Sequence, residues 1–592
     1  MNDLLKYPFD CLEILRKYKS IRRALIKNDN FIDVKIFVAS GTTTDEIIKI
    51  LEVFLLNAGI KPEFLLGNYG LFYEDLIFEN KDLKDFNPDL IYVHTSFKNL
   101  KNIPKVSDSI SDIDQKLNNE FCNFKDIWKK IGESYGCPVI QNNFELPPQR
   151  ILGNLDSTLP SGLTNYITNL NYKFSRHANL NDNLYLNDIN YLSAFHGIEN
   201  WFSMKEWYRS KHSVSLKYVP YLSYNIANII SALYGKSKKG LVLDLDNTLW
   251  GGVVGEDGYN KVILGDEGIG LIYKNFQKVV KKLINSGVLI VLVSKNNEFD
   301  VKEVLKKNKN MILKEKDITA MKVNWQEKSK NIIELSKELS LGMDSFVFWD
   351  DNPIERKKVK MKVKDVTVID PKKNIEEWPR QLASLNIFES GQLTKEDKIK
   401  TQLYKIRDDF ENNKKNYDDE VQYLRSINIS VKVHEINKNN IVRAEQLCNK
   451  TNQFNLNLKR LNQKEIIKLT NKKNYDLKML SLKDDYGDHG LIAIYGIHFQ
   501  KDKFKIDLFA MSCRVLGRYL ENWILNKIKD YAKIKKSRFI HADFVKGPRN
   551  NIFKQFLLDN GFLNIKKKNE TGVYKMNILN KIKFLEIYEK NR

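Results

Sequence analysis

Short apolar runs that end in polar residues recur along the first third of this chain. They cover Val34–Ser40, Asp89–His94 and Val139–Asn143, and the segments between them have helical spacing. A Thr/Asp cluster, Thr42–Asp45, is placed to cap a helix expected over Glu46–Ala58. Strands that alternate with helices in this way favour a parallel sheet that is covered on both faces.

The alternation resumes after Tyr234–Gly240, where small and basic residues mark a domain boundary. A stretch from about Lys395 to Arg425 is strongly charged and predicts a helical connector. Between these two points, four apolar runs predict the strands of a second α/β unit: Leu241–Leu245, Val288–Val293, Ser345–Trp349 and Asp365–Ile369.

Strand and helix patterns are mixed beyond about Asn428, which indicates an α+β region. The strands expected there are Ile429–Val433, Leu491–Phe499 and Phe504–Met511, and the helices are Arg443–Lys450 and Tyr519–Tyr531. The whole pattern predicts an α/β multidomain protein. Its expected parts are an α/β domain over 1–235, a Rossmann-like α/β domain over 236–385, a helical connector over 386–427 and an α+β domain over 428–592.

Composition narrows the classes of protein that remain. With 592 residues, 42% hydrophobic and 11% aromatic, the chain can bury several cores. The net charge of +22 comes from lysines spread along the whole chain, so we predict no nucleic-acid site, although a basic groove for an acidic carrier protein stays open. The five cysteines form no C-x-x-C pair, and no apolar run is long enough to cross a bilayer. These features predict a cytoplasmic protein without a membrane span.

The candidate chemistry begins at Asp244-x-Asp246-x-Thr248, directly after the apolar run Leu241–Leu243. A strand that delivers two carboxylates and a hydroxyl to its end suits Mg²⁺ and one phosphoryl group. Asp244 is the candidate nucleophile, because a carboxylate can form an aspartyl-phosphate. Asp246 can protonate the leaving oxygen and then activate water, and its backbone carbonyl can bind the metal.

Three further segments supply the other parts of a phosphoryl site. Ser294 and Lys295 follow the run that ends at Val293 and can hold phosphoryl oxygens, as can Thr248. Lys328, at a predicted helix start, can neutralise the charge that develops on phosphate. Asp350 and Asp351 follow another strand and complete a predicted metal set with Asp244 and Asp246.

This set of motifs resembles the haloacid dehalogenase (HAD) superfamily, and longer motifs resemble its FkbH-like branch over roughly residues 190–565. Trp349 departs from that pattern, which usually has a smaller aliphatic residue before the acidic pair. The motifs are Trp250-Gly-Gly-Val-Val-Gly-Glu-Asp-Gly258, Asn324-Trp-x-x-Lys328, Asp350-Asp-Asn-Pro-x-Glu-Arg356, Asn449-Lys-Thr-Asn-Gln-Phe-Asn455 and Ser512-Cys-Arg-Val-Leu-Gly-Arg518.

The N-terminal region resembles an SGNH-hydrolase-like domain, which implies a flavodoxin-like fold. The block around Ser40 is not the nucleophile block that the resemblance implies, and Gly67-Asn68 matches an oxyanion block only weakly. No Asp precedes His196 or His212 by three residues, as an Asp-x-x-His pair requires. We therefore expect a non-catalytic domain that serves as a scaffold or docks a partner.

The C-terminal region resembles an acyltransferase of the GNAT type. In that fold a turn that opens a helix cradles the pyrophosphate of coenzyme A with its N–H groups. Arg514 and Gly517 match this turn, but Tyr519 stands where a small residue is expected. The usual binding of coenzyme A is therefore in doubt, whereas the phosphopantetheine arm of a carrier protein stays a candidate ligand.

Cys513 allows two interpretations. A helix N-terminus together with Arg514 and Arg518 would lower its pKa and make it a nucleophile that carries an acyl group as a thioester. Alternatively, it is a small buried residue at a strand end. His489 is either a base for acyl transfer or a histidine in a turn between strands.

The resemblance implies a phosphatase and acyltransferase that loads a glyceryl group from a phosphorylated donor, 1,3-bisphosphoglycerate, onto an acyl-carrier protein through an enzyme thioester, with Mg²⁺ as cofactor. An alternative is a HAD phosphatase or acyltransferase that acts on a sugar precursor of a surface polysaccharide. A third hypothesis, a non-enzymatic scaffold, is less favoured because all the candidate phosphoryl-site residues are present.

Overall fold

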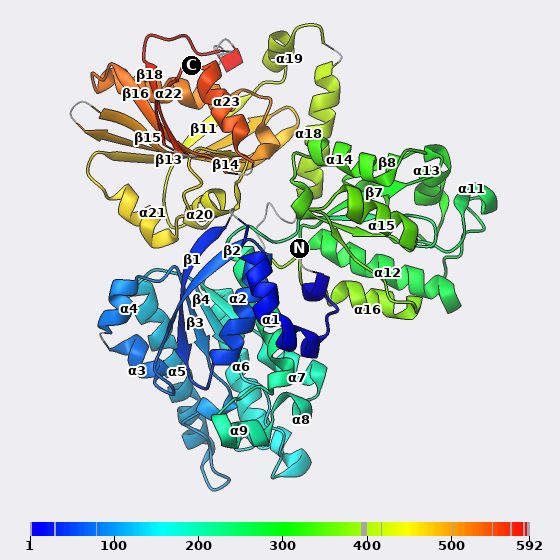
Figure 1. The fold of residues 1–592 in the computed structure, drawn as a ribbon, viewed down its shortest axis with the longest axis vertical. Helices are drawn as coiled ribbons and strands as arrows, with labels where there is room; N and C mark the ends of the chain where they lie inside the picture. The colour runs from blue at the N-terminus through cyan, green and yellow to red at the C-terminus, as the bar shows by residue number, and fades with distance from the viewer. Residues whose placement is uncertain are drawn as a thin grey trace. The chain divides into compact units, whose positions relative to one another are not determined.

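The structure is a computed structural model of the chain, and it describes residues 3–28, 31–78, 80–391, 400–415, 417–500, 503–547, 549–568, 571–583 and 587–588. Two compact units form: unit 1 is Met1–Leu233 with Asn462–Glu465, and unit 2 is Tyr234–Leu461 with Ile466–Arg592 (Figure 1). The composition change at Tyr234–Gly240 therefore coincides with the start of unit 2.

Unit 1 is built on a five-stranded parallel sheet of order β2-β1-β3-β4-β5, which confirms the predicted flavodoxin-like α/β fold. Sequence patterns predicted the three central strands and missed the outer two. The strands are β1 (Ile32–Ser40), β2 (Ile60–Leu66), β3 (Leu90–His94), β4 (Val139–Asn142) and β5 (Leu184–Asn187). The helices are α1 (Cys11–Leu25), α2 (Asp45–Asn57), α3 (Phe72–Ile77), α4 (Lys81–Phe86), α5 (Ile110–Ser134), α6 (Leu163–Asn179), α7 (Ile189–His196), α8 (Ile198–Trp201), α9 (Met204–Ser210) and α10 (Val219–Leu233).

Alternate residues of β1 face opposite sides of this sheet, and helices cover both sides (Figure 1). Phe37 lies in a core with Phe124 of α5 and Phe174 of α6. The predicted cap of α2 is wrong in one respect. Thr44 does occupy the N-cap position, but its side chain makes no capping bond and pairs instead with the Ser40 hydroxyl at 3.1 Å.

The first part of unit 2 is a second parallel sheet, of order β10-β9-β6-β7-β8, and the predicted Rossmann-like fold is confirmed. Trp349 is fully buried on one face between Phe276 and Trp378, so its bulk points away from the acids that follow it. The strands are β6 (Gly240–Leu243), β7 (Leu289–Ser294), β8 (Ala320–Val323), β9 (Phe346–Trp349) and β10 (Thr367–Val368). The helices are α11 (Val254–Asp257), α12 (Gly268–Asn285), α13 (Glu298–Lys307), α14 (Lys328–Glu338), α15 (Pro353–Lys362) and α16 (Trp378–Ala383).

The C-terminal part of unit 2 has the predicted α+β organisation. Its sheet runs β11-β13-β14-β15-β16-β18-β17, antiparallel except for the β15/β16 pair, with β12 added beside β15. The strands are β11 (Ser430–Glu435), β12 (Phe454–Asn455), β13 (Tyr475–Asp484), β14 (Gly487–Gln500), β15 (Lys503–Met511), β16 (Phe539–Val545), β17 (Leu563–Lys568) and β18 (Thr571–Asn577). The helices are α20 (Ile441–Lys450), α21 (Gln463–Thr470), α22 (Leu520–Ile534) and α23 (Asn551–Asp559).

The charged connector is helical, as predicted, over α18 (Lys400–Lys415) and α19 (Glu420–Ser426), while residues 395–399 and 416 of the prediction lie outside the described residues. It is also more deeply packed than a linker. Tyr404 of α18 belongs to the core of the parallel sheet in unit 2, and Phe410 belongs to the core of the α+β sheet. Among the described residues, no helix is long and apolar enough to cross a membrane.

Candidate active site

Three carboxylates meet at one edge of the parallel sheet in unit 2. Asp244 follows β6, and Asp350 and Asp351 follow the neighbouring strand β9. Because both strands are parallel, their carboxyl ends lie at the same edge, and one oxygen of each of the three carboxylates lies within 4.8 Å of the others. Hard oxygen ligands at this spacing fit a Mg²⁺ ion.

Lys328, the first residue of α14, lies between two of these acids. Its Nζ atom is 2.8 Å from Asp244 Oδ1 and 2.6 Å from Asp350 Oδ2. All three side chains are almost fully buried, and Asp350 has no exposed surface. The ammonium group therefore neutralises part of the negative charge that the strand ends concentrate here.

Burial and mutual repulsion set the pKa values of this cluster. Burial, reinforced by the charge of Asp244, raises the pKa of Asp350 to about 6, and the same causes raise the pKa of Asp351. Burial acts to lower the pKa of Lys328, but the two adjacent carboxylates outweigh it and raise that pKa overall. Lys328 therefore stays charged, and Asp350 takes up a proton more easily than an ordinary aspartate.

This arrangement predicts that Mg²⁺ affinity depends on pH. Below pH 6 each bound Mg²⁺ must displace a proton from Asp350, so the affinity should fall about tenfold per pH unit, and it should level off above pH 7. Isothermal titration of the protein with MgCl₂ between pH 5 and 8 measures this. Circular dichroism over the same range checks that the protein stays folded. Equal affinity at pH 5 and pH 7 would contradict the assignment of Asp350 as a ligand.

Asp246 is held apart from the metal set. Its Oδ1 accepts hydrogen bonds from Trp250 Nε1 at 2.9 Å and from the backbone N–H of Val254 at 3.1 Å, and its Oδ2 accepts one from Asn296 at 2.8 Å. The Asp246 side chain is therefore committed to these donors and lies outside the three-carboxylate cluster, and a metal role for its backbone carbonyl stays a prediction. These three donors hold the Asp246 carboxyl in one orientation, two residues after Asp244.

The three residues predicted to bind phosphate, Ser294, Lys295 and Thr248, each contact a different partner. Ser294 ends β7, is buried, and accepts a hydrogen bond from Asn296 at 3.2 Å. The Lys295 ammonium instead forms an ion pair with Glu355 at 3.0 Å. Thr248 is fully buried, and its hydroxyl accepts the backbone N–H of Asp351 at 3.3 Å, so it positions that acid.

Sequence reasoning did not assign a role to Asn296 or Arg356. Asn296 connects Asp246 with Ser294, and Arg356 donates to the backbone carbonyls of Asp350 at 2.8 Å and Asp351 at 2.7 Å. Asn352 caps α15 by accepting the N–H of Ile354, with Pro353 in the first turn. Together these contacts fix the chain direction immediately after the two acids.

Cys513 lies at a different place in unit 2. It opens a single 3₁₀ turn, η8 (Cys513–Val515), whereas the helix α22 begins only at Leu520. The prediction that a helix N-terminus and two arginines lower its pKa is therefore wrong. Burial raises the pKa of the thiol, and the charges of Lys239 and Arg407 only partly oppose this.

The turn that resembles a coenzyme A site is also closed. Gly517 adopts a left-handed backbone with φ +87°, and a Cβ atom there would lie 3.2 Å from Glu411 and 3.5 Å from Phe410 of α18. Arg518 is fully buried, donates to Asp484 at 2.7 Å and stacks on Phe410 at 3.9 Å. Arg514 keeps contact with Ser512 at 3.2 Å. The connector helix α18 thus lies directly against the Gly517 turn.

The remaining histidine candidates have structural partners. His489 is buried, and its Nε2 lies 3.0 Å from Asp484, which also binds Arg518. In unit 1, the Ser40 hydroxyl pairs with Thr44, and the His196 ring packs 4.0 Å from that of Tyr221. These contacts agree with a non-catalytic unit 1, which stays a prediction.

Comparison with known proteins links the chain to one family. Residues 56–231 match the family described as FkbH, N-terminal domain. Among solved structures, the N-terminal part of a Bacteroides fragilis protein, which contains a phosphatase domain and is complexed with Mg, is 30% identical with a TM-score of 0.59. That match covers 63% of this chain and 99% of the other. A search of curated proteins finds no match.

Smaller structures match about a quarter of the chain. A domain from Methanocaldococcus jannaschii is 13% identical with a TM-score of 0.22, and the match covers 25% of this chain and 99% of that domain. The GNAT domain of S. lividans PAT is 15% identical with a TM-score of 0.21, and the match covers 25% of this chain and 90% of that domain.

Proposed function

Because the chain belongs to the FkbH-like family of HAD enzymes, we propose that it is a Mg²⁺-dependent phosphatase that also transfers an acyl group. The observation that carries the phosphatase part is the convergence of Asp244, Asp350 and Asp351 around Lys328. The B. fragilis relative, which is complexed with Mg, supports the choice of metal.

In the proposed reaction, an Asp244 oxygen attacks phosphorus and forms an aspartyl-phosphate. Asp246, fixed by its N–H donors, protonates the leaving oxygen and afterwards takes a proton from the water that hydrolyses the intermediate. Lys328 stabilises the negative charge on the phosphoryl oxygens. Asp244, Asp350 and Asp351, with the carbonyl of Asp246, would hold a Mg²⁺ ion, and that ion would supply Lewis-acid charge to those oxygens.

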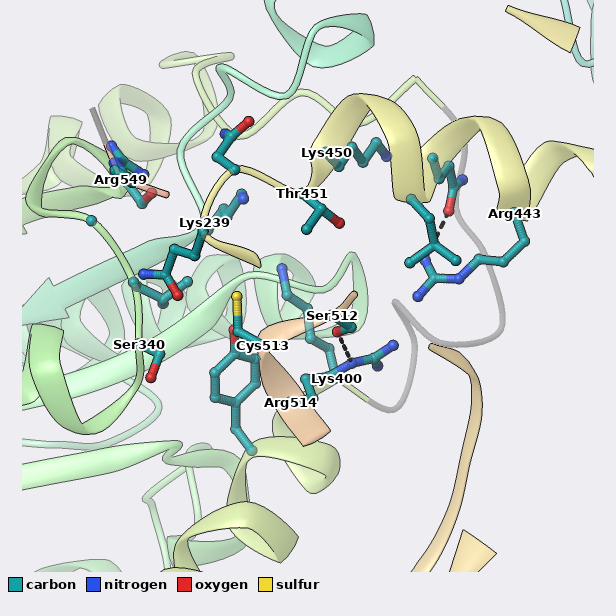
Figure 2. Close-up of a pocket in the computed structure, with 18 residues that line it drawn as sticks. Lys239, Ser340, Lys400, Arg443, Lys450, Thr451, Ser512, Cys513, Arg514 and Arg549 are labelled. Carbon is teal, nitrogen blue, oxygen red and sulfur yellow. Dashed lines mark hydrogen bonds between the residues drawn. The ribbon is translucent and has the colours of Figure 1, made fainter. Parts of the chain in front are cut away.

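For the acyl-transfer part, we propose that Cys513 carries a glyceryl group as a thioester. The donor is a phosphorylated three-carbon acid such as 1,3-bisphosphoglycerate, and the acceptor is the phosphopantetheine arm of an acyl-carrier protein. The support is the family resemblance of the segment around Cys513 and the position of its thiol on a cavity of unit 2 (Figure 2). The net charge of +22 suits an acidic carrier.

Intact-protein mass spectrometry tests this function directly. The enzyme is incubated with Mg²⁺, 1,3-bisphosphoglycerate and a holo-carrier protein, and both proteins are weighed. We expect a glyceryl adduct on the enzyme that moves to the carrier and that is absent in Cys513→Ala. Cys122→Ala, which removes an exposed thiol from unit 1, is the matched control and should keep the adduct. The absence of a glyceryl adduct on each of several carrier proteins would overturn glyceryl transfer. Release of phosphate from sugar phosphates but not from acyl phosphates would favour a sugar substrate instead.

A further inference from the structure

A cavity of about 160 Å³ opens beside Cys513 in unit 2 (Figure 2). Among its described lining residues there is no Asp or Glu. Six basic side chains line it: Lys239, Lys400, Arg443, Lys450, Arg514 and Arg549. A concave surface that carries one sign of charge concentrates ions of the opposite sign, so the lining favours an anion.

The cations of this cavity repel one another. The pKa of Lys239 is lowered to about 8, first by burial and then by the charges of Arg549 and Lys450. Burial also lowers the pKa of Arg549, which forms an ion pair with Asp344 outside the lining. Gly342 lies against the Arg549 guanidinium, where a Cβ atom would collide with it. Crowded cations of this kind are stabilised when an anion binds between them.

The cavity and the carboxylate cluster lie at opposite ends of the same strands. Lys239 immediately precedes β6 and Asp244 immediately follows it, and Ser345 and Asp350 flank β9 in the same way. At the rise of an extended strand, the five steps from Lys239 to Asp244 span roughly 17 Å. The thiol therefore lies near the amino ends of the strands and the carboxylates lie at the carboxyl ends, beyond direct contact.

We propose that this cavity is a second anion site, which binds the phosphate group of a small acyl phosphate and presents its carbonyl carbon to Cys513. The inference rests on the proposed function, in which Cys513 carries the acyl group. In Figure 2 the Cys513 sulfur points into the cavity on the side of Lys239, and these two residues interact electrostatically.

The reaction balances without a further reactant. The sulfur attacks the carbonyl carbon and forms a C–S bond, while the C–O bond to phosphate breaks and phosphate leaves with the electron pair. The thiol proton ends on the phosphate, so the products are a thioester and hydrogen phosphate. The basic side chains of the cavity stabilise the negative charge on the leaving phosphate, as Mg²⁺ would do at the carboxylate cluster. Because α18 covers the Gly517 turn, we expect acyl phosphates to react in preference to coenzyme A thioesters.

Inorganic phosphate is the first probe of the site. The full-length protein is treated with iodoacetamide in EDTA, with and without about 10 mM phosphate. Mass spectrometry then quantifies the modification of each cysteine peptide. We expect phosphate to slow alkylation of Cys513 at least about threefold, because it fills the cavity in front of the sulfur. Cys122, which is exposed in unit 1, should react at the same rate in both samples.

Two variants locate the site, and acetyl phosphate tests its chemistry. Lys239→Met and Lys450→Met should each abolish the protection and slow acetylation of Cys513 by acetyl phosphate at least about tenfold. Lys129→Met, at an exposed position of unit 1, should change neither. Thermal unfolding of all three variants checks that they fold. Acetyl-CoA should acetylate Cys513 far more slowly than acetyl phosphate does.

The outcomes separate this inference from the proposed function. If phosphate protects Cys513 and the protection requires Lys239, yet no carrier protein is acylated, the anion site stands and glyceryl transfer falls. If a carrier is acylated but phosphate protects nothing and Lys239→Met reacts like the wild type, the function stands and the anion site is wrong.

Discussion

We expect Asp244→Asn to abolish phosphate release, with kcat at least about 10⁴-fold below that of the wild type. An amide cannot attack phosphorus, and the substitution also removes one of the three carboxylates that lie within 4.8 Å of one another. Release of inorganic phosphate from a small acyl phosphate or aryl phosphate in excess Mg²⁺ measures the effect. Excess Mg²⁺ is required so that a weakened metal site does not account for the loss.

The fold should survive this substitution. Asn has the shape of Asp, and Lys328 keeps its contact with Asp350 at 2.6 Å when Asp244 loses its charge. Asp266→Asn is the matched control, because its side chain is 75% exposed in the same part of the chain and pairs only with Lys274 in the described contacts. Asp244→Asn with kcat within tenfold of the wild type would show that water, rather than Asp244, attacks phosphorus.

The positions of the carboxylates could be predicted because each is set by the residues that immediately precede it in the sequence. An apolar run that ends in an acid predicts both a strand and the place where its carboxylate emerges. Parallel pairing then brings the carboxyl ends of β6 and β9 to one edge, whatever the loops between them do. The positions of Asp244 and Asp350 follow from these two facts. The relation between Asp246 and Asn296 does not, because it depends on how two loops fold back over the sheet.

The Cys513 segment shows where local reasoning fails. Its sequence resembles a turn that opens a helix, but α22 starts at Leu520, after a left-handed Tyr519 with φ +54°. Arg518 donates a hydrogen bond to Asp484, and Glu411 of α18 lies against Gly517. These partners are distant in sequence, so no local pattern could reveal them. The strands β2 and β8 were missed for a simpler reason, since both lie at sheet edges and lack a continuous apolar run.

Lys328→Met tests the charge balance of the same site. The Lys328 ammonium is the shared partner of Asp244 and Asp350, which are almost fully buried. Without it, two carboxylates face each other, and breaking a buried ion pair from one side costs about 3–5 kcal/mol. We therefore expect the metal-free variant to unfold at a clearly lower temperature than the wild type. Its kcat in saturating Mg²⁺ should fall about 10²–10³-fold, because the charge on the phosphoryl oxygens loses one stabilising cation.

Mg²⁺ should rescue the stability of this variant but not its activity. A bound dication replaces the missing positive charge between the acids, so the rise in Tm on adding MgCl₂ should be larger for Lys328→Met than for the wild type. Lys330→Met, at an exposed position on the same helix α14, is the control and should behave like the wild type in both assays. Differential scanning calorimetry with EDTA and with MgCl₂ measures the two shifts. Equal shifts in variant and wild type, together with normal kcat, would mean that Lys328 is a packing residue and that the carboxylates balance their charge by another route.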